Sequence, residues 1–181
     1  MQRSLRLAYA AGADSTDQSL RLNVPTDLSY AEALLANRTR PVVALIPGAE
    51  WETKRWGSAR FADLAKDFIG RGATVVLLGG PNEKSIASEI TAAVPQVVDA
   101  IGNTIAEALS ILACCDAVVG GDTGLVHCAR ALGRKTVMLF GPTDPRRHQL
   151  SDTEVVMTVG LDCQPCHDHG PRVHVLYFRI H

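Results

Sequence analysis

The chain has 181 residues, the length of one ordinary domain with a single hydrophobic core. Hydrophobic residues make up 46% and charged residues 20%, so the composition is that of a globular domain and excludes a disordered chain. Eighteen Lys and Arg residues stand against 19 Asp and Glu residues, for a formal net charge of -1. This balance excludes nucleic-acid binding through an overall basic field, so any anionic ligand must be held by local groups.

The sequence contains no apolar run long enough for a membrane helix, and residues 1–20 lack the pattern of a secretion signal. Its five cysteines are an odd number, and Cys114 and Cys115 are adjacent, which is not typical of a secreted disulfide framework. We therefore expect a cytoplasmic protein with reduced thiols and at most peripheral membrane association.

Residues 1–40 show weak periodicity and several turn formers, which indicates an interdomain linker with one helix near 30–36. From Pro41 onward, short apolar runs alternate with amphipathic stretches. The runs predict strands at 42–46, 74–78, 96–98, 117–119 and 136–140. The stretches between them predict four helices. The first is capped by Ser58 and ends at Gly70 or Gly72, and the second runs over 82–93. The third is opened by a Thr104–Glu107 capping box, and the fourth runs over 124–132.

This alternation predicts an α/β fold, with an open, doubly wound, Rossmann-like parallel sheet covered on both faces by helices. We assign the domain to residues 41–160 and an irregular tail that contains cysteine and histidine to residues 161–181. Ligands of such sheets bind beyond the carboxyl ends of the strands, so the turns at that edge are the candidate site.

The turn Gly120–Gly124 joins a predicted strand to a predicted helix, whose first amides are unpaired and favour an anion. Gly121 and Gly124 let the backbone approach a diphosphate closely, and Thr123 offers it a hydroxyl group. Asp122 repels phosphate but suits sugar hydroxyls. The alternative is that Asp122 or Thr123 only caps the helix. His127 lies one turn along the helix, where its imidazole can reach the same ligand.

A second loop, residues 47–56, follows the first strand and carries Lys54 between Trp51 and Trp56. An ammonium group there suits a departing diphosphate. The alternative is a solvated charge pair, with both tryptophans packed against the domain. Glu83 follows the second strand and suits ribose hydroxyls, although it also complements a helix dipole. Standard dinucleotide and P-loop fingerprints do not occur.

The tail contains a Cys163-x-x-Cys166 pair followed by His167, His169 and His174, which are residue types that bind zinc. A small zinc-stabilised interaction protein is therefore one alternative hypothesis. Because there is only one such cysteine pair, and it lies after the last predicted strand, we expect no bound metal.

Five segments, in this order and spacing, resemble glycosyltransferase family nine, the ADP-heptose:lipopolysaccharide heptosyltransferases, and in particular the heptosyltransferase II form. The resemblance covers about residues 41–145. The segments are Pro47-Gly48-Ala49-Glu50, Lys54-Arg55-Trp56, Leu78-Gly79-Gly80-Pro81-Asn82-Glu83, Asp122-Thr123-Gly124-Leu125-Val126-His127 and Phe140-Gly141-Pro142-Thr143-Asp144-Pro145.

The resemblance implies a GT-B fold of two Rossmann-like domains, of which this chain has the carboxyl-terminal, donor-binding one. It implies sugar transfer with inversion, no cofactor, no obligatory metal, and a carboxylate base in the other domain. It also implies two catalytic residues, Lys54 at the diphosphate and Asp122 at the heptose. The remaining donor-binding residues that it implies are Gly48, Ala49, Glu83 at the ribose, Asn103 at the adenine, and Thr123, Gly124, Leu125 and His127 at the phosphates.

Two features depart from the family. Gly57 stands where a proline usually follows the Lys-Arg-Trp triplet, and residues 167–181 do not resemble the family's carboxyl-terminal helices. We expect the chain to bind ADP-L-glycero-D-manno-heptose for transfer to the lipopolysaccharide inner core, whose acceptor is held by a missing amino-terminal domain. Alone, it is expected to bind but barely turn over. The other alternative is a non-catalytic nucleotide-binding module or subunit.

Overall fold

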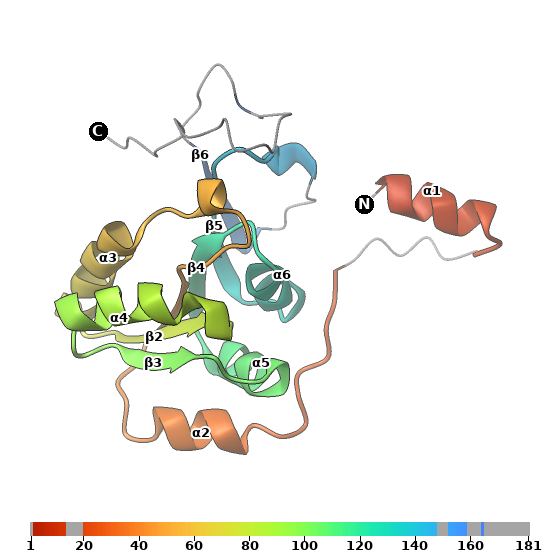
Figure 1. The fold of residues 1–181 in the computed structure, drawn as a ribbon. Helices are drawn as coiled ribbons and strands as arrows, with labels where there is room; N and C mark the ends of the chain where they lie inside the picture. The colour runs from red at the N-terminus through yellow and green to blue at the C-terminus, as the bar shows by residue number, and fades with distance from the viewer. Residues whose placement is uncertain (1, 14–19, 148–151, 159–163, 165–181) are drawn as a thin grey trace.

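The sheet has six strands, and all its neighbouring pairs are parallel, in the order β3-β2-β1-β4-β5-β6 (Figure 1). The computed structural model describes residues 2–13, 20–147, 152–158 and 164. The predicted α/β, doubly wound, parallel architecture is confirmed. The strands are β1 Val42–Ile46, β2 Thr74–Gly79, β3 Val98–Ile101, β4 Ala117–Gly121, β5 Lys135–Phe140 and β6 Glu154–Thr158.

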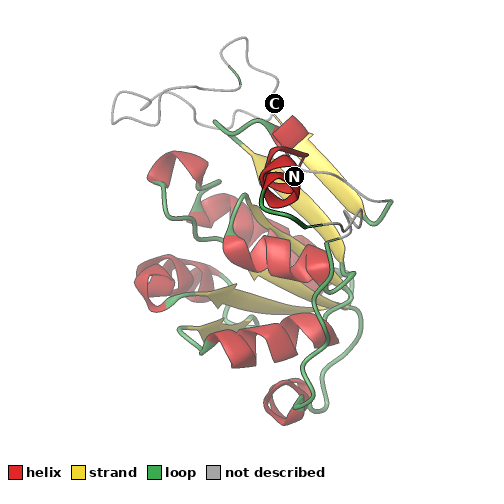
Figure 2. Ribbon diagram, turned by 90° about the vertical axis from the view of Figure 1, so that its right-hand side faces the viewer, coloured by secondary structure: helices red, strands yellow, loops and turns green. Residues whose placement is uncertain are grey.

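Helices cover both faces of the sheet (Figure 2). Two of them, α3 and α4, pack on one face, whereas α5 and α6 pack on the other and α2 packs against α5. The helices are α1 Gln2–Ala10, α2 Ser29–Leu35, α3 Ser58–Gly70, α4 Lys84–Ala93, α5 Ile105–Cys114 and α6 Gly124–Ala131, with short 3-10 turns η1 Glu52–Lys54, η2 Pro81–Glu83 and η3 Pro145–Arg147.

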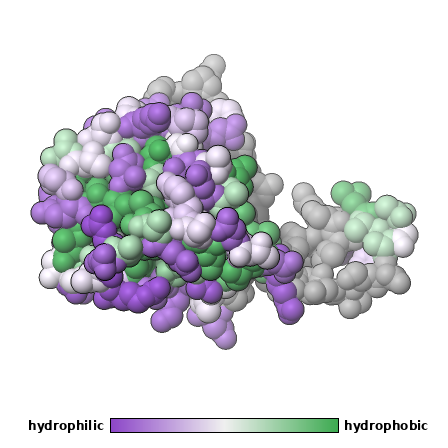
Figure 3. All heavy atoms as spheres, turned by 90° about the horizontal axis from the view of Figure 1, so that it is seen from below, coloured by the Kyte–Doolittle hydropathy of each residue, from purple (hydrophilic) through white to green (hydrophobic). Residues whose placement is uncertain are grey.

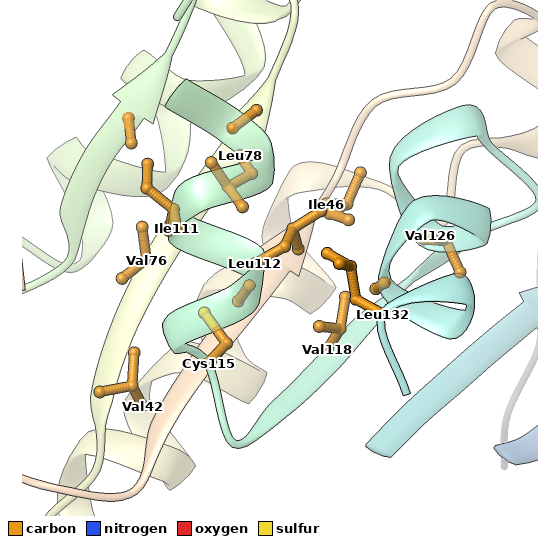
Figure 4. Packing of buried hydrophobic residues seen from close by; sticks show 14 of the residues in the cluster. Val42, Ile46, Val76, Leu78, Ile111, Leu112, Cys115, Val118, Val126 and Leu132 are labelled. Carbon is orange, nitrogen blue, oxygen red and sulfur yellow. The ribbon is translucent and has the colours of Figure 1, made fainter. Parts of the chain in front are cut away.

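The core consists of two hydrophobic layers, one on each face of the sheet. Alternate residues of β1 point to opposite layers, so that Val42 and Ile46 meet α5 and α6 whereas Leu45 meets α3 and α4. Figure 4 shows the first layer, in which Leu112 of α5 lies among strand side chains. Because both faces are buried, the central strands are continuously apolar. Truncating a side chain such as Leu112 to Ala removes roughly 2–5 kcal/mol of stability.

The predicted boundaries of β3 were wrong. The strand covers Val98–Ile101 rather than residues 96–98, and it forms one edge of the sheet. Within it, Val98 and Ala100 are buried whereas Asp99 is exposed, with a carboxylate oxygen that accepts a hydrogen bond from the Ile101 amide. An edge strand alternates buried and exposed residues, so Asp99 belongs to the strand although it reads as a turn former in the sequence.

Two further elements were not predicted. Strand β6 forms the other edge of the sheet, with Val155 and Met157 about half exposed, and its short apolar run Val155-Val156-Met157 was not assigned to a strand. Helix α1 lies apart from the body of the domain (Figure 1), and Figure 3 shows hydrophobic residues on its surface. Leu7 and Tyr9 of α1 are exposed. The predicted helix near residues 30–36 is confirmed as α2.

The start of α3 differs from the prediction. Gly57, not Ser58, is the N-cap residue, and the Ser58 hydroxyl instead donates to Glu89 of α4. Gly57 has φ +104°, a conformation that suits glycine and that the proline ring, fixed near -65°, does not allow. The backbone before α3 therefore differs from one that carries a proline at this position. Of the two predicted ends, Gly70 is the last residue of α3, and Gly72 follows the C-cap residue Arg71 with φ +87°.

The capping box of α5 is confirmed, because the Glu107 amide donates to the Thr104 hydroxyl while the Glu107 carboxylate accepts from the Thr104 amide at 2.8 Å.

No helix in the described part of the chain is both long and apolar enough to cross a membrane. The candidate zinc ligands Cys163, Cys166, His167, His169 and His174 lie outside the described residues.

Candidate functional site

The candidate residues follow the carboxyl ends of four strands that are neighbours in the sheet. Asn103 follows β3, Glu83 follows β2, the loop of residues 47–56 follows β1, and Asp122 begins the turn after β4. Neighbouring strands lie ~4.8 Å apart, so three steps along this edge span roughly 14 Å. The sheet thus arranges residues from four distant parts of the sequence into one row.

The loop after β1 is tied to the domain at several points. The Arg55 side chain donates to the carbonyl oxygen of Ala49 at 3.0 Å, and the ring of Trp56 packs edge-on against Phe61 with centroids 5.1 Å apart. Trp51 is half exposed. The alternative in which both tryptophans pack against the domain is therefore correct for Trp56 and wrong for Trp51.

Lys54 is not a solvated cation, because its Nζ lies 3.0 Å from Oδ2 of Asp122 and the two side chains are only 18% and 13% exposed. The contact forms because β1 and β4 are adjacent and because Gly121 has no side chain. A Cβ at Gly121 would lie 3.2 Å from the carbonyl oxygen of Lys54. The loop of one strand therefore rests on the end of the next, with a lysine and a carboxylate facing each other.

A line of polar contacts continues from Asp122 into the domain. Nε2 of His127 lies 2.9 Å from Oδ1 of Asp122, and Nη1 of Arg130 lies 3.1 Å from Nδ1 of His127. Nη2 of Arg130 lies 2.9 Å from Oε2 of Glu154, in a pair whose side chains are 4% and 5% exposed. Lys54, Asp122, His127, Arg130 and Glu154 thus form one connected network.

The first three members of this network were predicted from the sequence, whereas Arg130 and Glu154 were not. Arg130 lies three residues after His127, a helical spacing that places both side chains on one face of α6 and was available as a signal. Glu154 offered no such signal, because it belongs to β6, which the sequence pattern did not predict.

The amino terminus of α6 lies beside this network. Thr123 is its N-cap residue, but its side chain makes no capping hydrogen bond, and its buried hydroxyl has no partner among the described residues. A Cβ at Gly124 would meet nothing within 4 Å, whereas Leu125 packs partly against the core. The capping alternative is therefore wrong for Thr123. The first turn of α6 combines open space, an available hydroxyl and the positive end of a helix dipole.

Glu83 lies across the ends of β1 and β2. A Cβ at Gly48 would be only 2.2 Å from Cγ of Glu83, and one at Gly80 would be 3.1 Å from Oε2. Glu83 is the N-cap residue of α4 but makes no side-chain capping hydrogen bond. The neighbouring Ala49 is buried. The glycines therefore allow the Glu83 carboxylate to lie against the backbone at this edge of the sheet.

Asn103 lies at the β3 end of the row. Its Oδ1 accepts a hydrogen bond from the hydroxyl of Tyr30 at 3.2 Å, and its buried Nδ2 has no partner in the part of the chain that the structure describes. Tyr30 belongs to α2, so the segment before the domain reaches this end of the site. Among the described residues, no group of three His, Cys, Asp or Glu side chains is placed to hold a metal ion.

The fold and this edge define a Rossmann-like domain of the kind found in GT-B glycosyltransferases. The solved structure of ADP-heptose lipopolysaccharide heptosyltransferase II from Escherichia coli is similar, with a TM-score of 0.70 and 34% identity over 78% of this chain and 46% of that one. The family model of glycosyltransferase family 9 (heptosyltransferase) matches residues 1–175. The chain belongs to this family.

Two similar curated relatives are heptosyltransferases of the second type. Lipopolysaccharide heptosyltransferase 2 of Escherichia coli is 34% identical over 161 residues, which are 80% of this chain and 46% of the relative. Lipooligosaccharide heptosyltransferase 2 of Haemophilus influenzae is 38% identical over 114 residues, which are 59% of this chain and 33% of the relative. The chain therefore spans less than half the length of these two relatives.

Proposed function

We propose that this chain is the donor-binding, carboxyl-terminal part of an inverting heptosyltransferase and that it binds ADP-L-glycero-D-manno-heptose. The observation that carries the proposal is the contact between Lys54 and Asp122 beside the amino terminus of α6. A cation, helix amides and the Thr123 hydroxyl suit a diphosphate, while the carboxylate of Asp122 suits the hydroxyls of the attached sugar.

The order of the residues along the sheet supports this assignment. A nucleotide sugar presents its base, ribose, diphosphate and sugar in that sequence. The row begins at Asn103 for the adenine and continues with Glu83 for the ribose. Gly48 and Ala49 let the backbone after β1 approach the ligand. At β4, the turn from Thr123 to Leu125 takes the phosphates, and His127 lies beside this turn against Asp122.

In the proposed reaction, a hydroxyl oxygen of the lipopolysaccharide core attacks the anomeric carbon of the heptose. The bond from that carbon to the β-phosphate oxygen breaks, and ADP leaves with the electron pair. A carboxylate in the acceptor-binding half takes the hydroxyl proton. Lys54 and the amides of α6 stabilise the negative charge that develops on the diphosphate, so no metal ion is required.

The acceptor of this reaction is lipid-anchored, so we propose that the complete enzyme works at the cytoplasmic face of the inner membrane, with at most peripheral association. The acceptor half supplies both the base and the acceptor site. We therefore expect this chain alone to bind the donor and to show almost no transfer.

Calorimetric titration with ADP, ADP-heptose and AMP tests donor binding. We expect ADP to bind and AMP to bind more weakly, since AMP lacks the second phosphate. Lys54→Met is expected to weaken ADP binding about tenfold, which corresponds to ~1.4 kcal/mol. Lys66→Met is the matched control, because Lys66 is exposed and pairs only with Asp63 on the surface of α3. No ADP binding at millimolar concentration, or equal binding by the Lys54 variant, would overturn the proposal.

A further inference from the structure

The Arg130–Glu154 ion pair joins α6 to the edge strand β6 in a nearly solvent-free position. Nη2 of Arg130 lies 2.9 Å from Oε2 of Glu154, and neither side chain is more than 5% exposed. Removing one partner of such a pair leaves an uncompensated buried charge, which is strongly destabilising. The guanidinium is therefore held in a fixed place relative to the first turns of α6.

The other terminal nitrogen of this guanidinium, Nη1, faces the imidazole ring of His127. Nη1 of Arg130 lies 3.1 Å from Nδ1 of His127. A guanidinium has only donors and does not lose its proton in proteins, so Nδ1 must be the acceptor and carries no hydrogen. The imidazole proton is then on Nε2. That nitrogen lies 2.9 Å from Oδ1 of Asp122, which is an acceptor, so both contacts require the same tautomer.

The geometry points to Arg130 as a positioning residue that fixes His127 in its neutral, Nε2-protonated tautomer. This role rests on the proposed function, because its consequence concerns the donor. His127 donates to Asp122 and holds one carboxylate oxygen, while Lys54 holds the other at 3.0 Å. When a diphosphate draws Lys54 toward itself, the histidine keeps Asp122 aimed at the sugar hydroxyls. A protonated imidazole would place an N–H against the guanidinium.

Nitrogen-15 NMR of the whole chain with labelled histidine tests the tautomer without any ligand. The chain has six histidines, and the His127→Gln variant identifies the signals of His127. At about pH 7, we expect one protonated nitrogen, Nε2, and one unprotonated nitrogen, Nδ1. A proton on Nδ1, alone or together with one on Nε2, overturns the inference. Because no nucleotide is present, this result is separate from any failure of the chain to bind ADP.

The variant pair Arg130→Met with Glu154→Met removes both buried charges together and keeps the volume nearly constant, which such sites tolerate. We expect Nε2 of His127 in this double variant to keep its proton toward Asp122, while the nitrogen-15 signal of Nδ1 moves because this nitrogen has lost its donor, and we expect ADP-heptose to bind several-fold more weakly. An unchanged Nδ1 signal overturns the inference. Circular dichroism confirms folding. If the double variant does not fold, the tautomer of His127 in the unmodified chain still decides the question.

The His127→Gln background supplies the control for a merely structural role. A glutamine amide nitrogen takes the place of Nε2 and donates to Asp122 without a tautomer to fix. In this background, we expect removal of the Arg130–Glu154 pair to leave ADP-heptose affinity unchanged within twofold. A loss as large as in the histidine background shows that the pair acts only through general stability, and it overturns the positioning role.

Discussion

Gly48 lies so close to Glu83 that no side chain fits between them. A Cβ at position 48 would be 2.2 Å from Cγ and 2.7 Å from the carboxyl carbon of Glu83. The glycine after β1 thus sets the place of the carboxylate after β2, which we assign to the donor's ribose. Two segments that are distant in the sequence meet here because β1 and β2 are neighbours in the sheet.

Gly48→Ala is expected to displace Glu83 and to weaken ADP binding about tenfold, since the carboxylate leaves its position but the flexible side chain avoids a severe clash. Calorimetry measures the affinity, and thermal unfolding reports stability, which should change little. Gly70→Ala is the control, because a Cβ there would meet nothing within 4 Å. Equal ADP affinities for the Gly48 and Gly70 variants would show that Glu83 does not bind the nucleotide.

Gly120 at the end of β4 and Gly124 at the start of α6 allow stability and ADP binding to be tested separately. A Cβ at Gly120 would lie 2.7 Å from Val126, 2.9 Å from Ile46 and 3.0 Å from the Ile46 carbonyl oxygen, whereas one at Gly124 would meet nothing within 4 Å. We expect Gly120→Ala to lower the free energy of unfolding by roughly 1–3 kcal/mol.

For Gly124→Ala, we expect normal stability but ADP binding at least tenfold weaker, because the new methyl group occupies the space beside the helix amides. Urea unfolding and calorimetry measure the two quantities for both variants. Tight ADP binding by the Gly124 variant would place the diphosphate elsewhere.

The sequence revealed the parts of this fold that are buried on both faces. Strands such as β1 and β2 are continuous apolar runs buried on both faces, whereas β6 has only the shorter run Val155-Val156-Met157 and lies half exposed at an edge. The same difference between central and edge strands applies to the candidate site. Lys54 and Asp122 could be predicted because their residue types suit a nucleotide sugar and their motifs are recognisable, but Glu154 could not be, since its contact with Arg130 depends on β6.

The capping box of α5 predicts a pH-dependent contribution to stability. Hydrogen bonds from the Thr104 side chain and then from its backbone amide lower the pKa of Glu107 from its ordinary value. The folded-state pKa is therefore below the unfolded one. The stabilisation is present above the unfolded-state pKa and is lost as the pH falls through the folded-state pKa.

Thr104→Ala is expected to lower the free energy of unfolding by about 1 kcal/mol at neutral pH, since the amides at the start of the helix lose their acceptor. NMR titration should show the pKa of Glu107 moving up toward its ordinary value. Thr91→Ala, in α4, is the control, because the Thr91 hydroxyl donates to the carbonyl oxygens of Ala87 and Ser88 in its own helix. An unchanged Glu107 pKa in the Thr104 variant would contradict the assigned cause.

Cys115 is expected to be inert in the folded protein although Cys114 is adjacent to it. Burial raises the pKa of the Cys115 thiol to about 12, with smaller contributions from Cys114 and Asp116. Since the thiolate is the reactive form, alkylation at about pH 8 should leave Cys115 unmodified until the chain unfolds. Peptide mass spectrometry identifies the alkylated residue. Modification of Cys115 as fast as in the unfolded chain would show that the site opens readily.

The same pKa shift links Cys115 to stability in base. The unfolded thiol ionises near its ordinary value of 9.0 and the folded one near about 12, so the folded state holds the proton over this interval. The resulting stabilisation is complete below the lower value and is lost as the pH rises toward the higher one. Cys115→Ala should therefore flatten the alkaline fall in the free energy of unfolding. Cys114→Ala, at a more exposed thiol, should change that slope less. Parallel curves for the unmodified chain and the Cys115 variant would refute the linkage.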